Sequence, residues 1–112
     1  MVSVNVTLDG AGLLKCCRAC GHAGAGRRGS DLVCAAISVL TRTLIRTLAD
    51  RRGITIRGSV GKPGDFLLEV EATPEGTPFL DGAGAFFVEG ALSVSAEFPD
   101  YCTVTIESRP ET

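Results

Sequence analysis

The segment at residues 2–8, VSVNVTL, has the most regular pattern in the chain, because its apolar and polar residues alternate without exception. Successive side chains of a β-strand point to opposite sides, so the pattern predicts a strand with one buried and one solvated face. Asp9 and Gly10 follow as a hairpin turn signal, and residues 13–20 are expected to form the returning strand. A chain that begins in this way needs a second layer of structure over one face of a sheet.

Two segments are candidates for helices in that layer. Residues 30–51 carry apolar side chains at helical spacing, and Gly53 is expected to end this helix. Residues 79–98 are harder to assign, because Gly82, Gly84 and Gly90 each disfavour a helix by about 1 kcal/mol relative to alanine. Part of this segment also alternates like a strand, but strands are rarely so long. We therefore predict a second helix.

The remaining alternating segments, residues 54–57, 66–71 and 101–107, predict three further strands. The predicted order is ββαββαβ. This order indicates an α/β fold of the α+β type, in which a five-stranded mixed sheet is packed with two helices. A length of 112 residues supports one domain, spanning residues 1–112.

Composition narrows the classes of partner and the cellular compartment. The net charge is −2, so the composition gives no sign of the basic surface that direct nucleic-acid binding requires. The five cysteines are an odd number, and the N-terminus shows no basic region followed by an apolar run and a cleavage site, so we expect no signal peptide. No apolar stretch approaches the roughly 20 residues of a membrane span. We expect a cytoplasmic protein with free thiols and no membrane contact.

The candidate site is the segment GHAGAGRRGSDLVCAAIS at residues 21–38. His22 precedes a glycine-rich loop, and Ser30 is a candidate N-cap that places Cys34 in the first turn of the helix. Unpaired N–H groups at a helix start favour a thiolate, and such sites lower a cysteine pKa from about 8.5 to between ~3.5 and ~7.5. His22 could then take the proton, as in other Cys–His pairs. The alternative is a buried cysteine that serves only as a small hydrophobe.

The same segment resembles the ribosomal-processing cysteine protease family, called Prp. The resemblance rests on the GHA triplet, the glycine-rich loop and the pattern G-x-D-h-V-C-A-A-h-S, in which h is apolar. It implies a cysteine endopeptidase that removes a short N-terminal extension from bacterial large-subunit ribosomal protein twenty-seven. It also implies that Cys34 is the nucleophile and His22 the base, with no cofactor and no metal.

Other positions of the motif receive lesser roles from the resemblance. Asp31 and Ser38 match motif positions and are expected to support the Cys–His pair. The loop is expected to order over a bound peptide; its predicted residues are Gly21, Ala23, Gly24, Gly26, Gly29 and Ser30. Family members are often homodimers, and the glycine-rich second helix with Phe86 and Phe87 would suit such a contact.

Three alternatives remain open at this point. Cys17, Cys20, His22 and Cys34 have the residue types of a zinc site, although an odd spacing would send Cys17 and Cys20 to opposite faces of a strand. The C-x-x-C spacing also occurs in redox dithiols. A third possibility is an adaptor that binds a ribosomal tail without cutting it.

Overall fold

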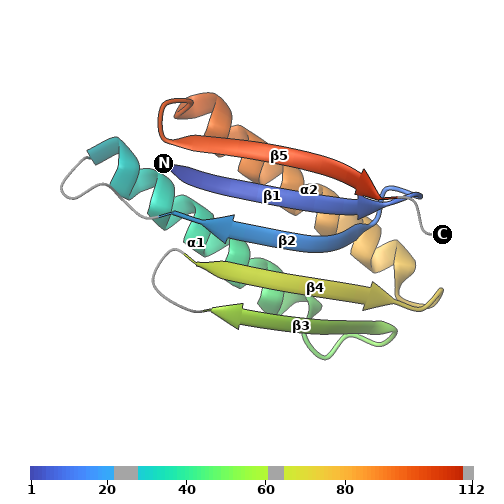
Figure 1. Cartoon of the computed structure of the whole chain (residues 1–112). Helices are drawn as coiled ribbons and strands as arrows, with labels where there is room; N and C mark the ends of the chain where they lie inside the picture. The colour runs from blue at the N-terminus through green and yellow to red at the C-terminus, as the bar shows by residue number, and fades with distance from the viewer. Residues whose placement is uncertain (22–27, 61–64, 110–112) are drawn as a thin grey trace.

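The computed structural model describes residues 1–21, 28–60 and 65–109, and at residues 28–31 and 60 it describes the backbone alone. The predicted order of elements is confirmed (Figure 1). The elements are β1 (Val2–Asp9), β2 (Leu14–Cys20), α1 (Arg28–Leu48), β3 (Ile54–Val60), β4 (Phe66–Ala72), α2 (Thr77–Glu97) and β5 (Cys102–Arg109).

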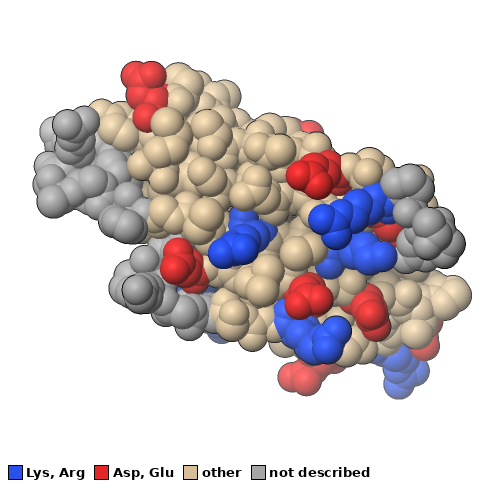
Figure 2. All heavy atoms as spheres, viewed as in Figure 1, with Lys and Arg blue, Asp and Glu red and all other residues tan. Residues whose placement is uncertain are grey.

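The strands form one mixed five-stranded sheet in the order β3-β4-β2-β1-β5. β1 pairs in parallel with β5, whereas the other three neighbouring pairs are antiparallel. Both helices cover the same face of this sheet, and its other face is open (Figure 1). On the open face, Lys and Arg lie intermixed with Asp and Glu (Figure 2). The predicted fold class is therefore confirmed as a sheet with helices on one side.

The alternation predicted for β1 is the reason the sheet has a dry face. Val2, Val4 and Val6 are buried under the helices, while Asn5 is exposed on the other side. β2 alternates poorly in sequence, and the register between β1 and β2 accounts for this by shifting between Thr7 and Leu8. Because of this irregularity, Leu14 and Cys17 are both buried although they lie three positions apart.

The first helix follows its predicted apolar stripe but not its predicted ends. Val33, Ile37, Leu44 and Leu48 are buried against the sheet. α1 begins at Arg28 rather than at residue 30, and it ends at Leu48 rather than near residue 51. Asp50 then adopts a left-handed conformation with a φ of 57°, which turns the chain after the last helical residue.

The glycines of the second helix have a packing role. A Cβ on Gly84 would lie 3.1 Å from the Cβ of Leu14 in β2, and one on Gly90 would lie 2.9 Å from Cδ2 of Leu40 in α1. These two glycines therefore allow α2 to approach both the sheet and its neighbouring helix closely. By contrast, a Cβ on Gly82 would meet nothing within 4 Å.

The hydropathy of α2 corrects the expectation that no stretch approaches the length of a membrane span. Judged by length and composition alone, α2 is long and apolar enough to cross a membrane. In the fold it packs on the sheet, where it buries Leu80, Gly84, Phe87 and Ala91.

Candidate active site

A pocket of about 310 Å³ opens between α1 and one end of the sheet. At this end β1 begins, β2 ends and β4 begins, so residues from distant parts of the sequence meet there. The lining is Val2, Ala19, Gly21, Cys34, Ile37, Ser38, Thr41, Arg42, Asp65 and Phe66.

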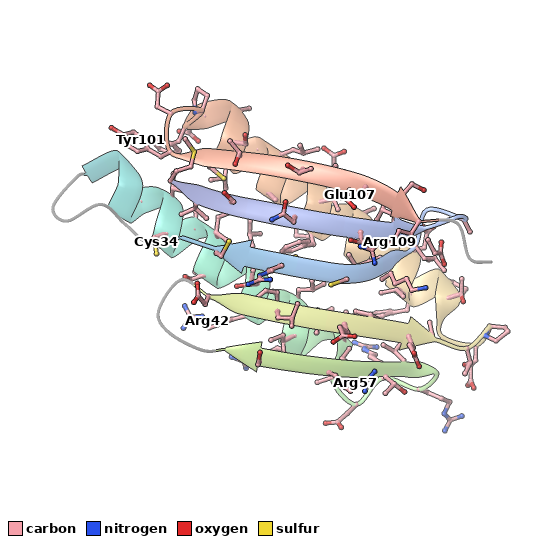
Figure 3. The ribbon with its side chains drawn as sticks, viewed as in Figure 1. Cys34, Arg42, Arg57, Tyr101, Glu107 and Arg109 are labelled. Carbon is pink, nitrogen blue, oxygen red and sulfur yellow. The ribbon has the colours of Figure 1, made fainter. Side chains whose placement is uncertain are left out.

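One face of α1 contributes half of this lining. Cys34, Ser38 and Arg42 follow one another at intervals of four residues, so they form a row along the helix. Cys34 is partly buried, and Figure 3 shows it and Arg42 at the end of the sheet where β2 ends. Ile37 and Thr41 lie beside this row and are buried. The sulfur of Cys34 is therefore in contact with a cavity rather than enclosed in the core.

Two side chains on this face of α1 are held by hydrogen bonds within the helix. The Thr41 hydroxyl donates to the backbone carbonyl of Ser38 at 3.1 Å. Nε of Arg42 donates to the same carbonyl at 3.3 Å. The Arg42 side chain is thus folded back toward Ser38, in the direction of Cys34.

The predicted position of Cys34 in the first helical turn is wrong. Because α1 begins at Arg28, Cys34 is in the second turn, and Ser30 is inside the helix rather than at its N-cap. The N–H groups without helical partners belong to the first four residues of a helix. The backbone N–H of Cys34 is therefore used within α1, and the argument from unpaired N–H groups does not apply to this thiol.

The sheet supplies the opposite wall of the pocket. Ala19 pairs with Phe66 across β2 and β4, and both side chains are buried beneath the helices. Val2 is held in place by its backbone N–H, which donates to the carbonyl of Tyr101 at 2.8 Å. These three apolar residues make the wall that faces the Cys34 row.

Gly21 joins β2 to the predicted catalytic loop, and its geometry requires glycine. Its φ is +105°, a conformation that side chains with a Cβ rarely adopt. A Cβ at this position would also overlap the carbonyl oxygen of Met1 and would lie 3.2 Å from Cα of Val2. The glycine that precedes His22 is therefore set by close contact with the start of β1.

Several predicted residues lie outside what the structure describes. His22, Ala23, Gly24 and Gly26 are not among the described residues, so the His22–Cys34 pair stays a prediction. The backbones of Gly29, Ser30 and Asp31 lie in the first turn of α1, but their side chains are not described.

Three of the other cysteines lie on β2 and follow its two faces, and the fourth, Cys102, is buried at the start of β5. Cys17 is fully buried, and this burial raises the pKa of its thiol to about 12. Cys16 faces the open side, where partial burial and the neighbouring Glu69 carboxylate also raise its pKa. Cys20 is partly buried, and all described cysteines are free thiols.

These positions disfavour both alternative uses of the C-x-x-C segment. A zinc ligand must be a thiolate, whereas Cys17 is held in its neutral form in the core. Cys17 and Cys20 point to opposite faces of β2, so a disulfide between them would require the backbone to move. Within the described ranges, no three or more His, Cys, Asp or Glu residues gather to hold a metal ion.

The sequence motif did not identify the residues opposite the Cys34 row. Val2, Ala19 and Phe66 come from three different strands, and Asp65 immediately precedes the last of them. That these strands are neighbours is known only once the strand order is known. Arg42 was available from the sequence, because it continues the four-residue spacing of Cys34 and Ser38.

The family profile described as cysteine protease Prp matches residues 1–103. No curated protein matches the chain. Among solved structures, SMU.848 from Streptococcus mutans is 24% identical, with a TM-score of 0.79 over 97% of this chain and 96% of the other.

Two structures of a ribosomal processing protease Prp from S. aureus are also similar. One holds a substrate peptide and is 15% identical, with a TM-score of 0.81 over 96% of this chain and 100% of the other. The second holds a covalently linked product peptide and is 16% identical, with a TM-score of 0.79 over the same shares. At these identities the likeness establishes the fold.

Proposed function

Because the chain belongs to the cysteine protease Prp family, it is a cysteine peptidase, and we propose that its substrate is the precursor of bacterial large-subunit ribosomal protein twenty-seven. In this proposal the enzyme acts in the cytoplasm and removes a short N-terminal extension. The observation that carries the assignment of the nucleophile is the exposure of Cys34 to the pocket. The other described cysteines lie outside this lining.

The proposed reaction uses Cys34 and His22 as a dyad. His22 accepts the thiol proton, and the sulfur attacks the scissile carbonyl to form a tetrahedral intermediate. As the C–N bond breaks, the imidazolium returns the proton to the leaving amine, which departs with the processed protein. Water then hydrolyses the thioester, with His22 accepting a proton from the attacking water and returning it to the departing sulfur.

Position 34 in the second turn of α1 limits how the oxyanion is stabilised. The backbone N–H of Cys34 is occupied within the helix, so the hydrogen-bond donors must be other groups. Ser38 lies one turn further along the same face and borders the pocket. We assign Ser38 and Asp31 to support of the dyad rather than to bond making.

The apolar wall of the pocket supports an extended peptide as the substrate. Val2, Ile37 and Phe66 are buried side chains that border the cavity beside Cys34. Such a surface would bind an apolar side chain of the peptide close to the scissile bond. This agrees with aromatic residues before the cleavage site, as the family resemblance implies.

The experiment is incubation of the protein with a peptide that spans the extension and the mature N-terminus, followed by mass spectrometry. We expect a single cut with the wild type and none with Cys34→Ala. Cys20→Ser is the matched control, because it removes a thiol that does not line the pocket. Cleavage retained by Cys34→Ala would exclude the assignment of the nucleophile.

We also propose that two copies of the chain associate through their helices. A groove of about 390 Å³ lies between α1 and α2, and none of the described residues that line it is charged. Phe86 borders the groove and is 74% exposed. In a two-fold dimer the same patch meets itself, so Phe86 of each copy could enter the groove of the other. This contact would bury an apolar surface that water otherwise covers.

A further inference from the structure

Among the described residues, the rim of the Cys34 pocket carries one cation and one anion. Arg42 comes from α1 and Asp65 immediately precedes β4, and both are exposed. The other described residues of the lining are uncharged. In the described part of the chain these two side chains form no ion pair with each other. Each therefore keeps hydrogen-bonding capacity for a molecule in the pocket.

The hydrogen bond of Arg42 fixes where its free donors lie. Its Nε donates to the Ser38 carbonyl at 3.3 Å, which leaves the terminal nitrogens of the guanidinium for other partners. Ser38 is four residues beyond Cys34, or about 6 Å along the helix axis. An extended peptide advances about 3.3 Å per residue. For a peptide that runs along this face of α1, the Arg42 guanidinium held at the Ser38 carbonyl would therefore meet a substrate group roughly two residues from the one beside Cys34.

The two side chains have opposite hydrogen-bonding requirements. A guanidinium only donates and an ionised carboxylate only accepts. A carboxylate on the substrate would satisfy Arg42 but would be repelled by Asp65, and an ammonium group would meet the reverse problem. An amide satisfies both, because its C=O accepts from Arg42 and its N–H donates to Asp65.

We propose that Arg42 and Asp65 are specificity-determining residues that together bind an uncharged amide of the substrate about two residues from the scissile bond. This inference rests on the proposed peptidase function. The amide is either the carboxamide of an Asn or Gln side chain or a peptide unit of the main chain. A side-chain carboxamide bound in this way would be selected over a charged side chain at this position, whereas a bound main-chain peptide unit would fix the register of the peptide.

The test uses charge reversal in the full-length protein with the junction peptide as substrate. Arg42→Glu and Asp65→Arg should each lower kcat/KM by about tenfold or more, mainly through a higher KM. If the amide is a side-chain carboxamide, the double variant should recover most of the loss, because a carboxamide can rotate and exchange its C=O and NH2 ends, whereas a main-chain peptide unit cannot. Arg46→Glu is the matched control, since it makes the same charge change on an exposed part of α1 outside the pocket.

Two sets of peptides identify the source of the amide. In one set, each Asn or Gln near the junction is replaced by Leu or by its acid. In the other, each nearby peptide bond is replaced by an ester, which removes the N–H donor. One of these peptide substitutions should weaken cleavage by the wild-type enzyme but cause no further loss of cleavage by the Arg42→Glu enzyme. That substitution identifies the group that Arg42 and Asp65 bind.

The outcomes separate this inference from the proposed function. Binding of fluorescent peptide to Cys34→Ala, measured by anisotropy, reports on Arg42 and Asp65 even if no cleavage occurs. If the wild type cleaves the peptide but both single variants stay within twofold of Arg46→Glu, the pair has no role. The inference would also be overturned if no peptide substitution had the expected effect, or if an Asn or Gln substitution had that effect while the double variant cleaved no better than the single variants.

Discussion

Gly21 lies against the carbonyl of Met1 so closely that a Cβ on the glycine would overlap the carbonyl oxygen. The two residues come from neighbouring strand ends, because β1 begins where β2 finishes. The contact sets the direction in which the chain leaves β2 toward His22. A motif glycine is thereby explained by the start of the chain rather than by the chemistry of the site.

Replacing Gly21 by alanine should therefore lower both stability and peptide cleavage. The positive φ alone costs a residue with a Cβ about 1 kcal/mol or more, and relief of the overlap must shift the start of β1 or the exit of β2. Gly12→Ala is the matched control, since Gly12 has a φ of +88° but no atom within 4 Å of its added Cβ. Urea unfolding should show a larger loss for Gly21→Ala, and only this variant should cleave the junction peptide more slowly. Equal losses in the two variants would show that the contact with Met1 has no effect.

Ionisation of Cys17 should make the folded state less stable at alkaline pH. Its pKa is raised from its ordinary value of 9.0 to about 12, so the unfolded chain releases this proton first. The stabilising effect is fully present below pH 9 and is lost as the pH rises from 9 toward 12. At pH 10 the expected loss is about 1.4 kcal/mol.

The measurement is urea unfolding of the wild type and of Cys17→Ala, under reducing conditions, from pH 7 to pH 10. Cys17→Ala should be less stable at neutral pH because it leaves a small cavity. The gap between the two proteins should narrow toward pH 10, since only the wild type has this thiol. A gap independent of pH would contradict the raised pKa.

Phe86→Glu should dissociate the dimer proposed above into monomers. The substitution places a charge at the mouth of a groove whose described lining residues are uncharged, so the buried contact would leave a carboxylate without a partner. Light scattering coupled to size exclusion measures the mass directly. Leu92→Glu is the control, because Leu92 is an exposed apolar residue of α2 outside this groove. The interface is wrong if Phe86→Glu stays dimeric or if both variants dissociate equally.

The glycines of α2 should differ when each is replaced by alanine. Gly82→Ala gains up to about 1 kcal/mol from helix propensity, because its Cβ would meet no atom within 4 Å. Gly84→Ala should be less stable than Gly82→Ala, because its Cβ would press on the Leu14 side chain at 3.1 Å and this crowding would cancel most or all of the gain in helix propensity. Thermal unfolding at a concentration where the chain is monomeric separates the two. A higher midpoint for Gly84→Ala than for Gly82→Ala would contradict this packing.

The elements that the sequence predicted well are those whose periodicity is local. The valines of β1 and the apolar stripe of α1 occupy the faces expected of them. The second helix was also predicted despite its glycines, and Gly84 and Gly90 prove to be points of close packing. The Cys34–Ser38 face followed from helical spacing alone.

Features that depend on pairing between distant segments could not be predicted. The register shift between Thr7 and Leu8 explains why Leu14 and Cys17 share a face, but nothing in β2 alone indicates it. Phe66 enters the site because it pairs with Ala19, which depends on the strand order. The start of α1 was misplaced because a serine before an apolar run resembles a cap, while the helix continues through it to Arg28.

The parallel pairing of β1 with β5 has a consequence for how the enzyme folds. Val2, a wall of the pocket, is anchored to Tyr101, and β1 lies in register with β5 from Val2 opposite Cys102 onward. The strand that holds the first residue of β1 in place thus comes from a segment about 100 residues later in the sequence. The position of Val2 beside Cys34 therefore depends on a long-range pairing, which closes later in folding than the local hairpin of β1 and β2.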